Sequence, residues 1–213
     1  MKVLICVAHP DDEVLGAGGA IASYVKNGDE VASIIFTYGE NSSLVKPRSQ
    51  LARERIAEST RACKILGIKN LHFLGLPDTT LRKERRTEET KKKVGGILKK
   101  YDPDIILTHS IDDGHPAHTS VAKLVKRQVS SQGLNARIYT FNNWSPIRSK
   151  NLGKPKLVVD TSKFFNKKKR ALKEFKTQSK TLGWSYNVAL TLVKDYWNGV
   201  RHGKMTAEVF YKW

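Results

Sequence analysis

The residues best suited to chemistry lie in two short segments that are far apart in the chain. The first is the pentapeptide His9-Pro10-Asp11-Asp12-Glu13, and the second is the stretch 109–118, which holds half of the six histidines. Consecutive carboxylates near a sheet edge are costly unless a cation neutralises them. Imidazole and carboxylate groups together suit Zn²⁺ or another first-row metal. Taken alone, the pentapeptide is equally well explained as the acidic first turn of a helix, but the second segment favours a metal site.

The spacing inside the second segment predicts how two of its histidines lie. His115 and His118 are three residues apart and Pro116 fits the first turn of a helix, so both imidazoles can face one site. Three protein ligands with one open position are typical of catalytic zinc, whereas structural zinc has four ligands and more sulfur. Such a metal lowers the pKa of bound water. A spare carboxylate can then accept a proton, and a spare histidine can polarise a carbonyl or donate to a leaving amine.

Short apolar runs alternate with helical patterns along most of the chain. Strands are expected over 2–8, 31–37, 71–76, 104–108, 136–141 and 157–159, and helices over 14–26, 48–66, 88–101, 115–129 and 163–180, with a loop at 80–84. This alternation predicts an α/β fold, a Rossmann-like three-layer sandwich with a mainly parallel central sheet of five or more strands. Residues 1–213 are expected to form a single domain.

The polar segments occupy informative places in this pattern. Ligands of open α/β sheets bind beyond the carboxyl ends of the strands, near the point where strand order reverses. The pentapeptide follows the first expected strand, the loop 38–47 follows the second, and the histidine-rich stretch follows the fourth. The small residues 16–20 resemble part of a dinucleotide fingerprint, but Ile21 stands where its third glycine belongs. We expect these small residues to let the helix pack closely instead.

Composition limits the classes of protein that this chain can represent. The 213 residues carry 38 Lys and Arg against 20 Asp and Glu, a formal net charge of +18. The basic residues cluster at 82–100 and 148–180 without a zinc finger, KH loop or RNP pattern, so nucleic acid is not the favoured partner. A solvated lysine-rich surface is the simplest explanation, and an anionic substrate or a polyanionic partner are the alternatives. No apolar run approaches the ~20 residues of a membrane span, and no signal peptide is expected.

Cysteines and late aromatic residues give two further expectations. Cys6 and Cys63 both lie in apolar patterns, which indicates buried thiols in a reducing compartment and a cytoplasmic location. For the aromatic residues near the C-terminus, core packing is the usual role, and a substrate mouth or a subunit contact in a homo-oligomer are the alternatives. These residues are Trp184, Tyr186, Tyr196, Trp197, Tyr211 and Trp213.

The first motif, Ala8 to Glu13 followed by Gly16, Gly18 and Gly19, resembles the opening motif of the LmbE-like/PIG-L zinc-dependent N-deacetylases. The similarity continues along nearly the whole chain, through residues 36–40, 55–67, 76–78, 115–118, 169–178 and 207–210. It implies hydrolysis of the N-acetyl group of an N-acetylglucosamine-type amino sugar, with release of acetate and a free amine. It also implies that His9, Asp12 and His118 hold the metal, which is zinc or else Fe²⁺ or another divalent ion.

The same resemblance implies the remaining roles in the site. Asp11 would be the general base, and His115 would stabilise the oxyanion and assist the leaving amine. Arg55, Asp78 and Glu40 with its loop would contact the sugar, which is the small-molecule partner. The sequence departs from the family pattern at Ala117, where the family has an Asp that orients the first histidine. We therefore expect His115 to be less basic here, with Asp112 or Asp113 as candidate replacements.

Two other functions remain open. A basic α/β module could keep this fold and bind a polyanion without turnover, although a pure binding module has no need of the spare carboxylate of Asp11. A dinucleotide-dependent oxidoreductase would require the missing glycine and a ribose-binding acid, for which Glu40 is the candidate.

Overall fold

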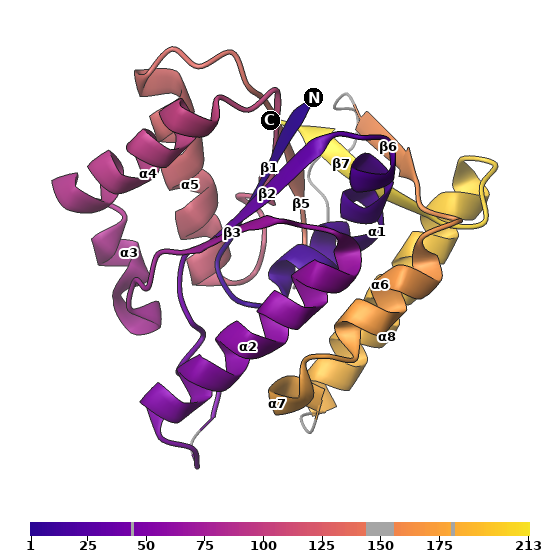
Figure 1. Cartoon of the computed structure of the whole chain (residues 1–213), viewed down its shortest axis with the longest axis horizontal. Coiled ribbons are helices and arrows are strands. Elements are labelled where there is room, and N and C mark those ends of the chain that lie inside the picture. The colour runs from indigo at the N-terminus through magenta and orange to yellow at the C-terminus, as the bar shows by residue number, and fades with distance from the viewer. Residues whose placement is uncertain (44, 144–155, 180–181) are drawn as a thin grey trace.

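The computed structural model describes residues 1–43, 45–143, 156–179 and 182–213. Helices cover both faces of one twisted sheet (Figure 1). The elements in chain order are β1 (Lys2–Val7), α1 (Asp12–Lys26), β2 (Glu30–Ile35), α2 (Arg48–Leu66), β3 (Asn70–Phe73), the 3-10 helix η1 (Asp78–Thr80), α3 (Leu81–Glu84), α4 (Glu88–Tyr101), β4 (Ile105–His109), α5 (Pro116–Ser131), β5 (Arg137–Phe141), β6 (Lys156–Asp160), α6 (Phe165–Leu172), α7 (Lys176–Ser179), α8 (Leu182–Arg201) and β7 (Ala207–Lys212).

The sheet confirms the predicted α/β fold with a mainly parallel sheet. The strand order is β3-β2-β1-β4-β5-β7-β6, and the first five strands in that order are parallel. β7 runs antiparallel to both of its neighbours, β5 and β6. Because β1 pairs directly with β4, with Cys6 opposite Thr108, the loops that follow these two strands leave the sheet side by side. Strand order reverses at this point, where open α/β sheets bind their ligands.

Two apolar cores lie on the two faces of the sheet. α1, α2, α6 and α8 cover one face, and α4 and α5 cover the other (Figure 1). Alternate residues of β1 enter opposite cores: Val3, Ile5 and Val7 enter one, and Leu4 and Cys6 enter the other. A strand buried on both faces has no polar alternation, which is why β1 was recognisable as a central parallel strand. Cys6 and Cys63 are buried free thiols, as expected.

Small residues bring α1 close to the sheet and its neighbours, as the sequence predicts. A Cβ atom added at Gly16 would overlap the ring of Phe141, and one at Gly19 would lie 2.6 Å from the Thr161 side chain. The Cβ at Gly16 would lie 2.1 Å from that ring. Contacts this short do not occur between real side chains, so the present packing accommodates only glycine at positions 16 and 19. The glycines at 16 and 19 thus serve close packing rather than dinucleotide binding.

Two expectations about local structure are wrong, and two elements of the fold were not predicted. Residues 78–84 form η1 and α3 instead of a loop at 80–84, because Leu81 is buried in the core under α4 and α5. The helix expected at 163–180 is interrupted between α6 and α7. Phe175 lies in this interruption and is fully buried in the core under α1, α2, α6 and α8. The sequence patterns predict neither α8 nor β7. Within the described ranges, no helix is both long enough and apolar enough to span a bilayer.

Candidate metal and active site

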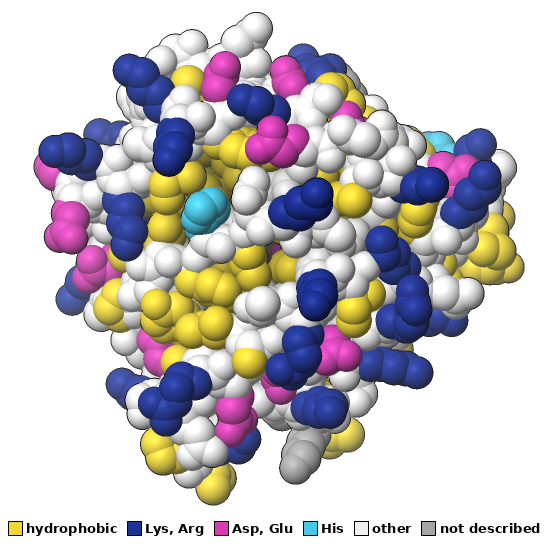
Figure 2. Space-filling view, viewed as in Figure 1, with side chains coloured by type: hydrophobic (Ala, Val, Ile, Leu, Met, Phe, Trp, Pro, Cys, Tyr) yellow, Lys and Arg dark blue, Asp and Glu magenta, His cyan; other side chains and the backbone are white. Residues whose placement is uncertain are grey.

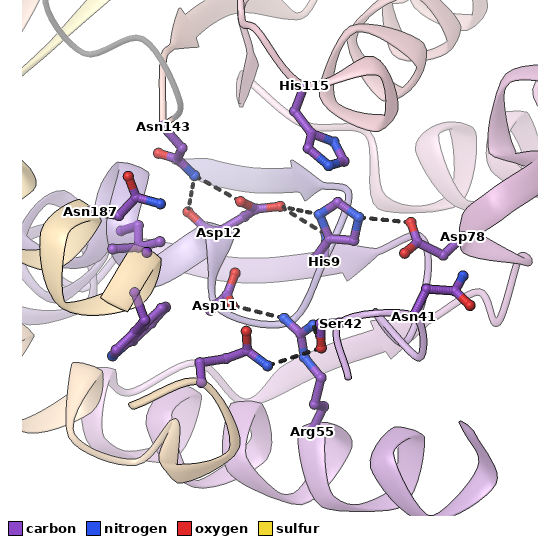
Figure 3. Close-up of a pocket in the computed structure, with 14 residues that line it drawn as sticks. His9, Asp11, Asp12, Asn41, Ser42, Arg55, Asp78, His115, Asn143 and Asn187 are labelled. Carbon is purple, nitrogen blue, oxygen red and sulfur yellow. Dashed lines mark hydrogen bonds and ion pairs between the residues drawn. The ribbon is translucent and has the colours of Figure 1, made fainter. Parts of the chain in front are cut away.

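The loops after β1 and β4 meet at a cavity of about 460 Å³. Figure 3 shows side chains from several elements converging on it. The β1 loop and the first turn of α1 contribute three acidic or imidazole groups, and α8 and the loop after β2 form the opposite wall. The lining residues are His9, Asp11, Asp12, Leu15, Asn41, Ser42, Arg55, Asp78, His115, Asn143, Gln178, Gly183, Trp184 and Asn187.

Asp12 is the centre of the polar cluster. Its Oδ2 lies 3.3 Å from His9 Nδ1, and its Oδ1 lies 3.3 Å from His118 Nε2. The backbone N–H of His9 donates to Oδ2 at 2.9 Å, and Asn143 Nδ2 donates to Oδ1 at 3.0 Å. Figure 3 shows the Asp12 carboxylate between Asn143 and His9. The structure thus brings together the three residues that the sequence proposes as ligands, although they come from two distant segments.

Two further histidines extend the set of available ligands. The ligand atoms of His9, His115 and His118 lie within 4.8 Å of one another, as do those of Asp12, His109 and His118. His109 had no assigned role in the sequence, although it ends β4 within the histidine-rich stretch. Its ring stacks on that of His118 at 3.8 Å, and its Nε2 accepts the N–H of Ala8 at 3.0 Å. His109 therefore supports the His118 ring from behind.

The surroundings of His9 and His118 fit a divalent metal. His118 Nδ1 lies 2.9 Å from Asp113 Oδ1, and His9 Nε2 lies 2.9 Å from Asp78 Oδ1. Metal-binding histidines usually have such a carboxylate on the nitrogen that faces away from the metal, because it fixes the orientation of the ring. The other ring nitrogen of His118, Nε2, is buried and has no hydrogen-bond partner among the described residues. A cation between His9, Asp12 and His118 would give this nitrogen a partner.

The charge balance of the site also favours a cation. The cluster holds five carboxylates, those of Asp11, Asp12, Glu13, Asp78 and Asp113, and a single guanidinium, that of Arg55, which pairs with Asp11, although the whole chain carries +18. Burial by itself lowers the pKa of His118, but the carboxylates of Asp12 and Asp113 overcome this and raise that pKa to about 10. In turn, His118 and His109 hold the pKa of Asp12 well below its usual range despite burial. The carboxylates around His118 thus stabilise positive charge at this place, as they would stabilise a bound metal.

Asp11 is held in an unusual conformation from two sides. Its φ of 118° is rare for a residue with a side chain and costs about 1–3 kcal/mol. Its backbone N–H donates to Glu13 Oε2 at 3.0 Å. Arg55 Nη2 donates to Asp11 Oδ2 at 2.8 Å and to the carbonyl of Pro10 at 2.6 Å. Burial raises the pKa of Asp11 to about 7, even though Arg55 opposes this shift.

Glu13 is the buried anchor beneath this loop. Its side chain is fully buried, and its Oε1 accepts a 2.7 Å hydrogen bond from Ser59 Oγ while Oε2 accepts the Asp11 N–H. Burial raises the pKa of Glu13 to about 7. Glu13 had no predicted role of its own, but its hydrogen bonds fix the backbone of Asp11.

His115 has a different environment from His118. It is the residue before α5, and its Nδ1 accepts the N–H of Ala117 at 3.3 Å, which leaves the ring hydrogen on Nε2. Burial lowers the pKa of His115, and the positive charges of His118 and His9 lower it further, to about 4. Asp113 accepts from the backbone N–H of His115 and binds the ring of His118. Asp113 therefore orients the other histidine rather than replacing the acid expected at Ala117.

The three residues predicted to contact substrate are already engaged with other site residues. Arg55 and Asp78 line the cavity, but Arg55 binds Asp11 and Asp78 binds His9. Glu40 lies behind them, since its Oε1 accepts the N–H of Asp78 at 3.0 Å and it is absent from the cavity lining. Trp184 lines the cavity, which agrees with the alternative of a substrate mouth for this residue. Three other lining residues had no predicted role, because the sequence patterns around them gave no clear signal. They are Asn143, Gln178 and Asn187.

Comparison with known proteins agrees with this geometry. The family model described as PIG-L, GlcNAc-PI de-N-acetylase, matches residues 4–129. A diacetylchitobiose deacetylase from Thermococcus kodakarensis is 31% identical over 189 residues, covering 83% of this chain and 70% of the relative. A 1D-myo-inositol 2-acetamido-2-deoxy-alpha-D-glucopyranoside deacetylase from Mycobacterium sp. (strain KMS) is 32% identical over 153 residues, covering 60% of this chain.

The chain spans half the length of that mycobacterial relative. Among solved structures, an N,N'-diacetylchitobiose deacetylase from Pyrococcus horikoshii superposes with a TM-score of 0.82 at 24% identity, covering 100% of this chain and 83% of the other. This likeness shows a shared fold that includes α8 and β7. From its match to the family model and its identity to the Thermococcus enzyme, the chain belongs to the PIG-L (LmbE-like) family.

Proposed function

We propose that this protein is a metal-dependent hydrolase that removes the N-acetyl group from an N-acetylglucosamine-type amino sugar. The observation that carries the proposal is the Asp12 carboxylate, held between His9 and His118 at the cavity with the carboxylate of Asp11 beside it. The printed names of the relatives, which are deacetylases of acetamido sugars, support the reaction class.

We assign the metal to His9, Asp12 and His118, with zinc as the native ion and Fe²⁺ as the alternative. An imidazole–carboxylate–imidazole set of three ligands suits either ion. When bound, the metal supplies a Lewis acid that polarises an amide carbonyl and activates water near neutral pH. Asp78 and Asp113 hold the two imidazoles from their far sides.

The remaining steps belong to side chains of this chain. Asp11 accepts a proton from the attacking water, and Arg55 and Glu13 keep its carboxylate in place. His115 carries its hydrogen on Nε2. As a neutral imidazole it donates a hydrogen bond from Nε2 to the developing oxyanion and keeps this hydrogen. The C–N bond of the amide breaks, the proton held by Asp11 passes to the departing nitrogen, and acetate and the free amine are released.

The cavity lining suggests how the sugar is bound. Asn41, Ser42, Gln178 and Asn187 offer amide and hydroxyl groups that match sugar hydroxyls, and Trp184 offers an aromatic face. Arg55, the only cation among the described lining residues, is already paired with Asp11. A neutral sugar therefore fits the described cavity better than a phosphorylated one. The cytoplasmic location stays a prediction from the two unbridged thiols.

Acetate release from N-acetylglucosamine and from its disaccharide and inositol conjugates tests the proposal. The assay compares the protein as purified, after treatment with a chelator, and after readdition of Zn²⁺ or Fe²⁺. We expect turnover that is lost on chelation and restored by one of the two ions. Turnover that persists in a protein shown by elemental analysis to be metal-free would refute the metal assignment. No turnover on any acetamido sugar, with the metal bound, would favour the polyanion-binding module instead.

A further inference from the structure

Helix α8 carries an apolar face that no described part of the chain covers. Six large side chains on it are between 57% and 92% exposed, and Ala189 is exposed among them. At 3.6 residues per turn these side chains fall on one face of the helix. We call this face the α8 stripe; its members are Leu182, Tyr186, Ala189, Val193, Tyr196, Trp197 and Val200. The stripe contains no charged residue in a chain that is 27% charged.

Core packing, the usual role of late aromatic residues, is therefore wrong for three of them. Tyr186 is 64% exposed, Tyr196 is 57% exposed and Trp197 is 60% exposed. Trp184, the other aromatic residue of this group in α8, does pack inward, with its ring 5.6 Å from that of Phe175. Contiguous exposed apolar surface of this kind marks an interaction site, whereas scattered apolar residues do not.

Six of the seven stripe residues form pairs that are symmetric about residue 191, and the seventh, Trp197, has Ser185 at its mirror position. Leu182 and Val200 are equally far from it, as are Tyr186 and Tyr196. Ala189 and Val193 form the innermost pair. When two identical helices pack antiparallel about a two-fold axis, residues at equal distances from the centre meet. In such a pair the small side chains lie at the crossing, where backbones approach closely, and the aromatic ones lie on either side.

We propose that the α8 stripe is a homodimer interface, in which two copies of α8 pack antiparallel about a two-fold axis near residue 191. A large side chain contributes on the order of 200 Å², so the exposed parts of the six large side chains offer roughly 700 Å². This approaches the ~800 Å² that each partner contributes to a stable interface. Tyr and Trp are also the residues most enriched at the centres of such interfaces.

A groove beside the stripe enlarges the apolar surface. It lies between α6 and α8, has a volume of about 490 Å³, and is lined by Leu172, Val188 and Leu192. Ala189 and Ser185 join it to the stripe. The groove gives the aromatic side chains of a second copy room to bury without rearrangement of the backbone, as expected for an interface formed by folded subunits.

The competing occupant is a polyanion, since the neighbouring surface is basic. Figure 2 shows Lys and Arg side chains gathered over the α6 side of the molecule, and the groove rim carries Lys169 and Lys173. These charges lie beside the stripe and not within it. Salt separates the two cases: it screens the repulsion between two copies of charge +18 and strengthens a dimer, whereas it weakens binding to nucleic acid or anionic lipid.

The molar mass of the full chain in solution tests the proposal without reference to activity, so its failure would leave the deacetylase assignment intact. Light scattering after gel filtration should give twice 24.0 kDa at micromolar concentration, with more dimer as NaCl rises from ~50 to ~300 mM. Val193→Glu places two like charges near the axis and should yield the monomer. Val45→Glu, which changes a valine that is 93% exposed elsewhere, should remain a dimer.

A second variant keeps the test decisive if Val193→Glu fails to fold. The double variant Ala189→Cys/Val193→Cys should form a covalent dimer on mild oxidation, since the native thiols Cys6 and Cys63 are buried. A wild-type chain that stays monomeric at every salt concentration would overturn the proposal. So would a dimer that survives Val193→Glu, the absence of a covalent dimer from the cysteine variant, or a monomer that binds anionic vesicles or nucleic acid through α8.

Discussion

Two buried clusters of charge contact helix α1, one around Asp12 and the other around Lys168. Lys168 is only 1% exposed, and its Nζ lies 2.6 Å from both Asp195 Oδ2 and Glu208 Oε1. Glu208 also accepts the N–H groups of Gly19 and Ala20 in α1. This cluster therefore ties α6, α8 and β7 to the helix that begins at the active-site loop.

The two clusters differ in where their positive charge comes from. In the Lys168 cluster, burial alone lowers the pKa of Lys168, but Asp195 and Glu208 outweigh burial and raise that pKa. The cation is part of the chain, and the cluster has no opening to the cavity. Around Asp12, five carboxylates gather near one guanidinium, which pairs with Asp11, and three of them, Asp11, Asp12 and Asp78, line a cavity. Buried charges that the chain compensates itself hold the fold together, whereas the uncompensated set is built for a cation from outside and for chemistry.

The sharpest test of this difference is Asp11→Asn. The amide cannot accept a proton, so we expect kcat to fall by about 10²–10⁴-fold while metal content and melting temperature stay close to those of the wild type. Steady-state kinetics with elemental analysis of the same sample checks both. Loss of the metal would make Asp11 a ligand and remove it from the role of base.

The opposite pattern is expected for Lys168→Met. Removing the cation leaves two buried carboxylates without a partner and should lower the free energy of unfolding by about 3–5 kcal/mol. The folded fraction should keep its kcat, because Lys168 does not line the cavity. Urea unfolding measures the first quantity. Lys173→Met, at an exposed lysine nearby, is the matched control and should change stability by less than about 0.5 kcal/mol. If the two variants lose equal free energy of unfolding, the Lys168 cluster does not hold the fold together as its buried contacts indicate.

Within the site, Asp113→Asn should weaken the metal without removing it. The 2.9 Å contact with His118 Nδ1 orients that ring, and loss of such a partner typically costs about 10–100-fold in metal affinity. Competition with a chromogenic chelator gives the affinity. His118→Ala serves as the reference for loss of a ligand. Wild-type affinity in Asp113→Asn would show that the stacked ring of His109 is enough to hold His118.

The smallest effect is expected from Glu13→Gln. The carboxylate that accepts the Asp11 N–H becomes a neutral amide, and a charge-assisted hydrogen bond is worth roughly twice a neutral one. We expect kcat to fall by about 10-fold with KM unchanged, because the substrate does not reach Glu13. Ser59→Ala removes the shorter of the two side-chain hydrogen bonds to Glu13 Oε1 and leaves the bond to Asp11 intact, so it should have a weaker effect. A rise in KM with kcat unchanged would show that Glu13 acts on substrate binding instead.

Much of the fold was readable because its signals are local. The helices α2 and α4 begin and end at the predicted residues, and α2 ends where Gly67 adopts a φ of 99°, as a left-handed helix cap requires. The two site loops were placed correctly because parallel strands end at one edge of the sheet. The pairing of Asp113 with His118, the stacking of His109 and the contact of Asn143 with Asp12 depend on side-chain directions that spacing does not encode.

Helix α8 shows most clearly where sequence patterns fail. Besides Trp184, its buried residues are Thr191, Asp195 and Gly199, whereas six large apolar side chains lie exposed in the stripe, which runs against the usual rule of apolar residues inside. The buried Asp195 is tolerated because Lys168 meets it, and Gly199 is needed because Thr206 approaches its backbone closely. The sequence alone determined the alternation of strands and helices and the residue types at the ends of β1 and β4, because these follow from periodicity and neighbouring residues. Only the tertiary structure decided which charges meet, since the free energy of a buried charge depends on partners that the fold brings together from separate segments of the chain, such as Lys168 with Asp195 and Glu208.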